Sequence, residues 1–217
     1  TQSFEAECVI IANSFAAKQF EPLQFLPLSL IRGQVTQVKP NTESAQLKTL
    51  LLYEGYCTPA RQTNDEITHC VGASFVPKCA ETDVRDSENE ANLQLLTDYL
   101  QRPLFDTGAI AGARAAVRCQ PTDYLPALGP VPDETFFMQA YARLRTGNFR
   151  TPFPPGVYQP GLYLNLGHGS RGIATTTLAA EYLASLIFNE PVPIDQQLAN
   201  FLAPARFLIR GLKRRNR

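Results

Sequence analysis

Apolar residues along this chain fall into short clusters separated by polar and proline-rich segments. The cluster at 7–14, "ECVIIANS", is apolar without a break at its centre, which is typical of a strand buried on both faces. The run at 67–75 alternates apolar and polar positions, which favours an antiparallel sheet with one covered face. By the same signals, strands are predicted at residues 7–14, 32–38, 47–53, 55–60, 67–75, 108–119 and 161–166.

Other segments carry apolar residues at helical spacing. Helices are predicted at 88–100, after Asp133 as far as Gly147, and at 172–188. Asp86 or Ser87 is the expected cap of the first helix and Asp133 that of the second, because both residue types accept hydrogen bonds from free backbone N–H groups. The third helix is apolar nearly all round and is expected to be buried. A proline-broken loop at 148–160 precedes the last strand.

Composition narrows the class of protein. The chain has 217 residues with 20 basic and 20 acidic side chains, so no overall field favours nucleic acid, a membrane or a charged ligand. It has no uncharged apolar run of about 18 residues and no secretion signal, so no membrane partner is expected. The mixture of short strands and helices, without repeats, indicates an α+β protein.

The cysteines and histidines give no sign of a disulfide framework or a metal site. The cysteines are odd in number and include no C-x-x-C pair, which favours reduced thiols in a cytosolic protein. They are Cys8, Cys57, Cys70, Cys79 and Cys119. His69 beside Cys70 is the nearest approach to a ligand pair, so we expect no metal.

Gly167, Gly169 and Gly172 form the pattern G-x-G-x-x-G between the last predicted strand and the last helix. A dinucleotide-binding fingerprint also needs a following strand with an acidic residue about 20 positions on, and here residues 189–198 are broken by prolines. Two interpretations stay open. Glycines before a helix N-terminus let an electron-rich ligand approach closely, or they make a tight turn that binds nothing.

Several segments together resemble one protein family. They are "VIIANS", "RGQV", "GYCTPA", "VGASF", "AGARAAVRCQPTDYLPALGPVPD", "GLYLNLGHGSRGIATTTLAAEYLASLI" and "PARFLIR", in that order. The chain resembles, over essentially all its length, the C-terminal flavin oxidoreductase module of the bacterial tRNA 5-methylaminomethyl-2-thiouridine biosynthesis bifunctional proteins. That module belongs to the D-amino-acid oxidase and glycine oxidase superfamily.

The resemblance implies FAD as cofactor and a division into three parts. Residues 1–20 would end a Rossmann-like FAD-binding domain whose N-terminal βαβ unit is not in this chain, 21–132 would form the antiparallel substrate-binding sheet, and 133–217 would hold an insertion, a strand–turn–helix facing FAD and the tail. The residues implied to contact FAD are Asn13, Gly167, His168, Gly169, Ser170, Arg171 and Gly172. Ser14 departs from the family, which usually has glycine there.

The resemblance also implies a reaction: oxidation of the C–N bond in a carboxymethylaminomethyl group on the wobble uridine of tRNA, with release of glyoxylate. Arg114 matches the arginine that holds the substrate carboxylate in glycine oxidase-like relatives, although Ala115 replaces the usual proline. Arg118 shares its strand face, and Tyr56 would line the pocket. The alternatives are exposed strand arginines paired with Asp123 or Glu134, and a core tyrosine. Because the flavin performs the chemistry, no catalytic side chain is expected.

Further expectations concern partners. The basic tail at 206–217, and the 148–160 loop with Arg143, Arg145 and Arg150, are candidates for contact with tRNA phosphates. The N-terminal FAD-binding segment and a methyltransferase domain would belong to the same full-length protein. Two rival functions stay open: an oxidase of glycine or D-amino acids, and a truncated, non-catalytic fragment. Arg32 in "RGQV" matches the family without an assignable role.

Overall fold

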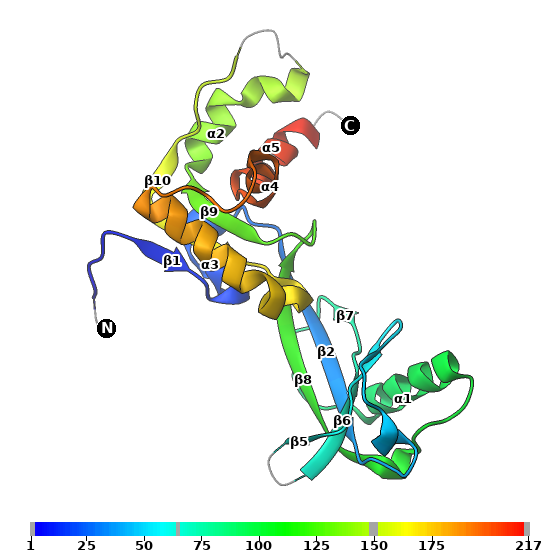
Figure 1. Ribbon diagram of the computed structural model, residues 1–217. Helices are drawn as coiled ribbons and strands as arrows, with labels where there is room; N and C mark the ends of the chain where they lie inside the picture. The colour runs from blue at the N-terminus through cyan, green and yellow to red at the C-terminus, as the bar shows by residue number, and fades with distance from the viewer. Residues whose placement is uncertain (1–2, 64–65, 148–151, 215–217) are drawn as a thin grey trace. The chain divides into compact units, whose positions relative to one another are not determined.

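The computed structural model describes residues 3–63, 66–147 and 152–214 (Figure 1). The chain forms two compact units: unit 1 comprises Thr1–Ser29 with Cys119–Arg217, and unit 2 comprises Leu30–Arg118. The chain enters unit 2 within strand β2 (Leu28–Val38) and leaves it within β8 (Ile110–Pro121). Helices and a largely antiparallel set of strands confirm the mixed α and β class.

Unit 1 is built on a three-stranded sheet in the order β1 (Val9–Ile11), β10 (Tyr158–Leu166), β9 (Ala127–Pro132). Strand β1 runs parallel to β10, with Ile11 opposite Leu164, whereas β9 is antiparallel to β10. Because the carboxyl ends of neighbouring parallel strands meet at one edge of a sheet, the residues after β1 and those after β10 emerge side by side.

Helices cover the sheet of unit 1. On one face, Ala179 and Tyr182 of α3 (Gly172–Phe188) pack against Leu128 of β9 and Leu202 of α4 (Gln196–Leu202). On the other face, Leu164 and Leu166 join a core with Leu23 and Leu26. Short 3-10 turns complete the fold, at η1 (Ser14–Gln19), η2 (Glu21–Leu23), η3 (Ser44–Gln46), η4 (Thr107–Ala109) and η6 (Gly169–Arg171).

The segment from Asp133 to Gly147 is helical but not one helix. The Asp133 carboxylate accepts a hydrogen bond of 2.9 Å from the Phe136 N–H, which confirms this residue as the N-cap. Helix α2 (Glu134–Ala140) then gives way to a 3-10 turn, η5 (Ala142–Thr146), which ends at Gly147 with φ +66°. Helix α5 (Ala205–Arg214) packs against both α2 and η5.

Unit 2 is an antiparallel sheet with strand order β3–β4–β6–β2–β7, in which β5 also pairs with β6 and β8 with β2. The shorter strands are β3 (Leu51–Leu52), β4 (Tyr56–Cys57), β5 (Arg61–Thr63), β6 (Glu66–Gly72) and β7 (Val76–Pro77). Helix α1 (Asp86–Leu100) covers one face through Leu93 and Leu96, which pack on Cys57 and Val71. The expected antiparallel sheet with one covered face is therefore confirmed.

The predicted cap of α1 was wrong. The N-cap is Arg85, and neither Asp86 nor Ser87 caps the helix. Instead, the side chain of Gln34 on β2 accepts from the Arg85 N–H at 2.9 Å and donates to the Arg85 carbonyl at 2.7 Å. A contact from a distant strand thus fixes where the helix begins, and local sequence could not reveal it.

Two predictions of burial were also wrong. Val9 and Ile10 are each 45% exposed, because β1 has three residues and lies at the edge among the strands of the described chain. In α3, Ile173 is 99% exposed and Phe188 is 73% exposed. Apolar composition predicts which residues favour burial, but burial itself requires another layer of chain on that face.

The described part of the chain contains neither a membrane-spanning helix nor a cluster of metal ligands. There, no helix is long and apolar enough to cross a membrane, and no group of three histidine, cysteine or acidic side chains could hold a metal ion. All five cysteines are unpaired, as expected.

Candidate functional site

The glycine turn of unit 1 is set by backbone conformation and close packing. Gly167 has φ +78° and Gly169 has φ +58°, values that L side chains rarely adopt. A β-carbon on Gly167 would lie 2.5 Å from Cδ of Pro121, and one on Gly169 would lie 2.8 Å from Oε1 of Gln120. Gly172 differs, since its backbone is helical and its nearest neighbour would be 3.7 Å away. Two of the three glycines are therefore required by the turn itself.

His168 links the end of the strand to the first turn of the helix. Its Nδ1 lies 2.8 Å from Oγ1 of Thr175, and its Nε2 lies 2.7 Å from Oδ1 of Asn165. Burial lowers the pKa of His168, which favours the neutral imidazole. Both ring nitrogens are used within the turn, so His168 orients this segment; a contact with a ligand stays a prediction.

The N-terminus of α3 presents a partial positive charge at this sheet edge. The N-cap Arg171 makes no side-chain capping bond, and the first turn contains no acidic residue. Ser170, Arg171 and Ile173 are exposed. Asn13 follows β1 at the same edge, is exposed, and makes no capping bond with its side chain. The structure thus gathers Asn13 and residues 167–172 at one edge, where an electron-rich ligand is favoured.

Ser14 occupies a position whose backbone favours glycine. Its φ is +61°, in the left-handed region, although its side chain has a hydrogen-bond partner in the Cys119 thiol. Burial raises the pKa of Cys119, and the Ser14 contact acts in the opposite direction. A glycine at this position would adopt the same backbone conformation without strain.

A second cluster lies on the face of the unit 2 sheet opposite α1. Because Cys57 and Val71 point into the core beneath α1, side chains one position away, at Tyr56 and Cys70, point to the other face. The guanidinium of Arg118 lies over Gly33, with Nη2 1.9 Å from where a β-carbon on that glycine would be. Arg118 is half-buried.

The positive charge of Arg118 acts on Tyr56. Burial raises the pKa of Tyr56, the neighbouring Cys70 raises it further, and the positive charge of Arg118 acts in the opposite direction. Arg114, four residues back along β8, is on the same strand face but is exposed. Within residues 3–63, 66–147 and 152–214, neither arginine is in an ion pair. Arg118 is thus a half-buried cation with no carboxylate partner there, an arrangement suited to a carboxylate ligand.

One alternative was that Asp123 pairs with Arg114 or Arg118. Its carboxylate instead pairs with two other arginines. Its carboxylate binds Arg206 through Nε at 2.9 Å and Nη2 at 3.1 Å, and it also pairs with Arg210. Arg206 is only 7% exposed and further donates to the Leu202 carbonyl at 2.7 Å. Burial raises the pKa of Asp123, but the contacts with Arg206 outweigh it and hold the pKa below its usual value.

This ion pair changes the interpretation of the basic tail. Asp123 forms ion pairs with both Arg206 and Arg210. Because Arg206 is also buried, the expectation that this residue contacts tRNA phosphates was wrong. Lys213 and Arg214 of the same helix are exposed. Arg143 donates to the Pro152 carbonyl at 2.9 Å and lies over the Phe153 ring. Arg150 and residues 215–217 fall outside the described residues.

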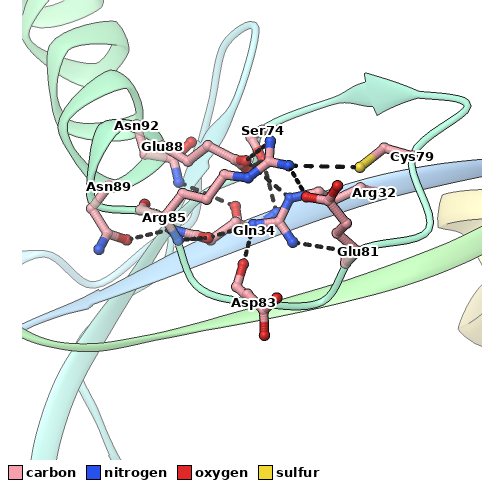
Figure 2. A network of polar contacts seen from close by, with 10 residues as sticks. All are labelled: Arg32, Gln34, Ser74, Cys79, Glu81, Asp83, Arg85, Glu88, Asn89 and Asn92. Atoms are coloured by element: carbon pink, nitrogen blue, oxygen red, sulfur yellow. Dashed lines mark hydrogen bonds and ion pairs between the residues drawn. The ribbon is translucent and has the colours of Figure 1, made fainter.

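A buried polar network supports β2 from the α1 side (Figure 2). Arg32 is fully buried, and its Nε donates to Oε1 of Glu88 at 2.9 Å. Its remaining donors bind Oε1 of Gln34 at 2.8 Å and the carbonyls of Glu81 and Asp83 at 2.9 and 2.7 Å. Burial raises the pKa of Glu88, but hydrogen bonds from Ser74 and Arg32 outweigh it. Sequence reasoning left Arg32 without a role, and only these contacts show that it holds the sheet to α1.

Comparison with known proteins identifies similar chains. The family described as "FAD dependent oxidoreductase" (DAO) matches residues 1–186. The tRNA 5-methylaminomethyl-2-thiouridine biosynthesis bifunctional protein MnmC of Methylobacillus flagellatus is 40% identical over 214 residues, which cover 97% of this chain and 32% of that protein. The protein of the same name from Chromobacterium violaceum is 38% identical over the same shares. The chain therefore spans about a third of the length of these relatives.

Solved structures show the same fold at lower identity. Glycine oxidase from Geobacillus kaustophilus superposes with a TM-score of 0.62 at 20% identity, over 92% of this chain and 45% of that one. Iminodiacetate oxidase from Chelativorans gives a TM-score of 0.58 at 16% identity, over 90% of this chain and 46% of that one.

Proposed function

Because the chain belongs to the DAO family of FAD-dependent oxidoreductases, we propose that it is part of an FAD-dependent amine oxidase that modifies tRNA. The proposed reaction removes the carboxymethyl group from 5-carboxymethylaminomethyl-(2-thio)uridine at the wobble position. Support comes from the relatives, which are named for biosynthesis of a modified tRNA uridine. We further propose that residues 21–132 bind the substrate, and that 1–20 and 133–217 contribute to the flavin side.

The observation that carries this proposal is Arg118 on the face of the unit 2 sheet opposite α1. The group to be removed ends in a carboxylate, and a guanidinium offers two parallel N–H donors to such a group. Arg118 is half-buried without a described counter-ion, and its charge acts on Tyr56, which points to the same face of the sheet. We assign Arg118 as the main carboxylate ligand, with Tyr56 lining the pocket and the exposed Arg114 making an outer contact.

The edge of unit 1 fits the flavin. An N-terminus of a long helix with no acidic residue in its first turn favours an electron-rich ring, and the glycines before it keep side chains out of the turn. FAD held at this edge would supply the two-electron oxidation that converts the C–N bond beside the substrate amine into a C=N bond. Water then adds to the C=N bond, leaving an aminomethyl group and glyoxylate. The residues of this chain orient and polarise the substrate, and none serves as nucleophile.

We further propose that an FAD-binding segment and a methyltransferase domain belong to the same full-length protein. Exposed apolar residues on β1 support the first of these two parts. Strand β1 ends the sheet order of unit 1, and Val9 and Ile10 on it are each 45% exposed. A parallel strand from the FAD-binding segment would pair with this edge and cover those residues. The relatives are about three times as long as this chain, which leaves room for both segments.

A substrate test separates this function from its rivals. The full-length protein, loaded with FAD, is mixed without oxygen with tRNA carrying the carboxymethylaminomethyl group, with glycine, and with D-alanine. We expect flavin absorbance to fall with the tRNA and to stay constant with the free amino acids. Loss of absorbance with glycine or D-alanine alone would favour the free amino-acid oxidase. A protein that retains no FAD after gel filtration would favour the non-catalytic alternative.

Contact with tRNA is proposed at the end of α5. Lys213 and Arg214 are exposed there, and α5 packs against η5, which brings Arg145 to the same part of unit 1. We expect the double change Lys213→Ala and Arg214→Ala to weaken tRNA binding at low salt. Binding with fewer phosphate contacts releases fewer counterions. The magnitude of the slope of log K against log salt concentration should therefore also fall by about 1–2.

Fluorescence anisotropy with labelled tRNA over a series of salt concentrations measures both quantities. Lys48→Ala is the control, because Lys48 is also exposed but lies in unit 2. Equal losses in the control and the double variant would contradict a specific role for the end of α5.

A further inference from the structure

Position 33, in the middle of β2, requires glycine because of its close neighbours and not because of its backbone angles. Its φ lies outside the left-handed region, so an L side chain would meet no conformational strain there. A β-carbon at this position would nevertheless lie 1.9 Å from Nη2 of Arg118 and 3.0 Å from its Cζ. Real β-carbons essentially never approach other atoms so closely, so the Arg118 guanidinium occupies the volume that any larger residue at position 33 would fill.

The strand beneath the guanidinium is held from its other face. Arg32 and Gln34, the neighbours of Gly33, point toward α1 and join the buried network of Figure 2. Gln34 donates to Oδ1 of Asn89 on α1 at 2.9 Å. Strand β2 therefore cannot move away from Arg118 without breaking buried hydrogen bonds, which is costly.

The segment alongside Gly33 is held as well. The carbonyl oxygen of Ser74 is the third near neighbour, 3.1 Å from the β-carbon position. Ser74 exchanges two hydrogen bonds with Gln34, accepting at Oγ from the Gln34 N–H at 2.8 Å and donating its own N–H to the Gln34 carbonyl at 3.0 Å. Among these neighbours, only the end of the Arg118 side chain is free to shift.

We propose that Gly33 is a positioning residue that fixes where the Arg118 guanidinium meets the substrate carboxylate. The inference rests on the proposed function, in which Arg118 binds that carboxylate. A β-carbon at position 33 displaces the guanidinium while the sheet stays in place. Because bidentate recognition depends on the position and plane of the guanidinium, the displaced arginine keeps its charge but loses its alignment.

The test is Gly33→Ala in the FAD-loaded full-length enzyme, with tRNA oxidation measured as kcat and KM. We expect kcat/KM to fall by about 10- to 100-fold, the effect of a displacement of about 1 Å in a substrate-orienting group, with most of the loss in KM. Gly112→Ala is the matched control. It lies on β8, and its β-carbon would approach the Gln37 side-chain oxygen at 3.2 Å and not Arg118. We expect less than about a twofold change for this control.

A double variant separates positioning from a general loss of structure. If Gly33 acts only through Arg118, then adding Gly33→Ala to Arg118→Ala causes no further loss of kcat/KM. The proposal is overturned if the two losses of kcat/KM are additive, or if Gly33→Ala leaves kcat/KM unchanged. It is also overturned if thermal unfolding shows that Gly33→Ala is not folded, because the flexible guanidinium is predicted to move aside for the added carbon.

A binding measurement keeps this inference distinct from the proposed function. The FAD-loaded enzyme is titrated with acetate, the simplest carboxylate, and the flavin spectrum reports binding. We expect the acetate Kd to rise about 10-fold or more in both Gly33→Ala and Arg118→Ala. If the wild-type enzyme fails to oxidise tRNA but acetate binding still depends on Gly33, the proposed substrate is wrong and the positioning role stands. Acetate binding that is unchanged in Gly33→Ala but weakened in Arg118→Ala overturns the positioning role alone.

Discussion

Replacing Arg118 with alanine is expected to lower kcat/KM for the carboxylate-bearing tRNA by about 30- to 800-fold, equivalent to about 2–4 kcal/mol. The side chain is half-buried, lies over Gly33, and has no described ion pair that would engage its charge within the protein. Its removal leaves the substrate carboxylate partly desolvated with no bidentate partner, and this accounts for the size of the loss. Steady-state kinetics of the FAD-loaded full-length enzyme measure it.

Two further variants make this prediction specific. Arg118→Lys keeps the charge but loses the planar pair of donors, so its activity should lie between those of the wild type and Arg118→Ala. Arg114→Ala should cost less, because Arg114 is exposed and its interactions are screened by solvent. The FAD content of all three variants should match that of the wild type. A larger loss for Arg114→Ala than for Arg118→Ala would exchange the two assignments.

The second large effect is expected at Gly167. We expect Gly167→Ala to lower the free energy of unfolding by about 2–5 kcal/mol. A left-handed φ costs an alanine about 1–2 kcal/mol, and an overpacked contact costs about 1–3 kcal/mol more. The overpacking arises because the new β-carbon would lie 2.5 Å from the Pro121 ring, which cannot turn aside as a flexible side chain does. Urea unfolding followed by circular dichroism measures the change, and FAD retention after gel filtration reports its effect on the site.

Gly172→Ala is the control within the same motif. This glycine has helical angles and no neighbour closer than 3.7 Å to the added carbon, so alanine should raise stability by up to about 1 kcal/mol. Equal destabilisation by the two changes would contradict the view that turn geometry alone requires Gly167. A stable Gly172→Ala protein that has lost FAD would instead show that the ligand approaches the first residue of α3.

Local sequence patterns predicted the elements that local interactions control. Helix α3 begins and ends at the predicted residues, and Asp133 caps α2 as its residue type suggested. The glycine turn could also be predicted, because a tight change from strand to helix needs residues that tolerate positive φ. The spacing of Arg114 and Arg118 placed them on one strand face, but it did not indicate which of the two is half-buried.

Local periodicity in the sequence predicted the antiparallel sheet and the main helices, and the quoted motifs indicated the family. The tertiary structure alone decided the partners of the arginines. Arg206 meets Asp123, Arg118 lies over Gly33, and Arg32 meets Glu88, in each case across more than fifty residues. Such contacts depend on how distant segments pack, and the charge of an arginine in the sequence is the same whether it is buried in an ion pair or free to bind a ligand.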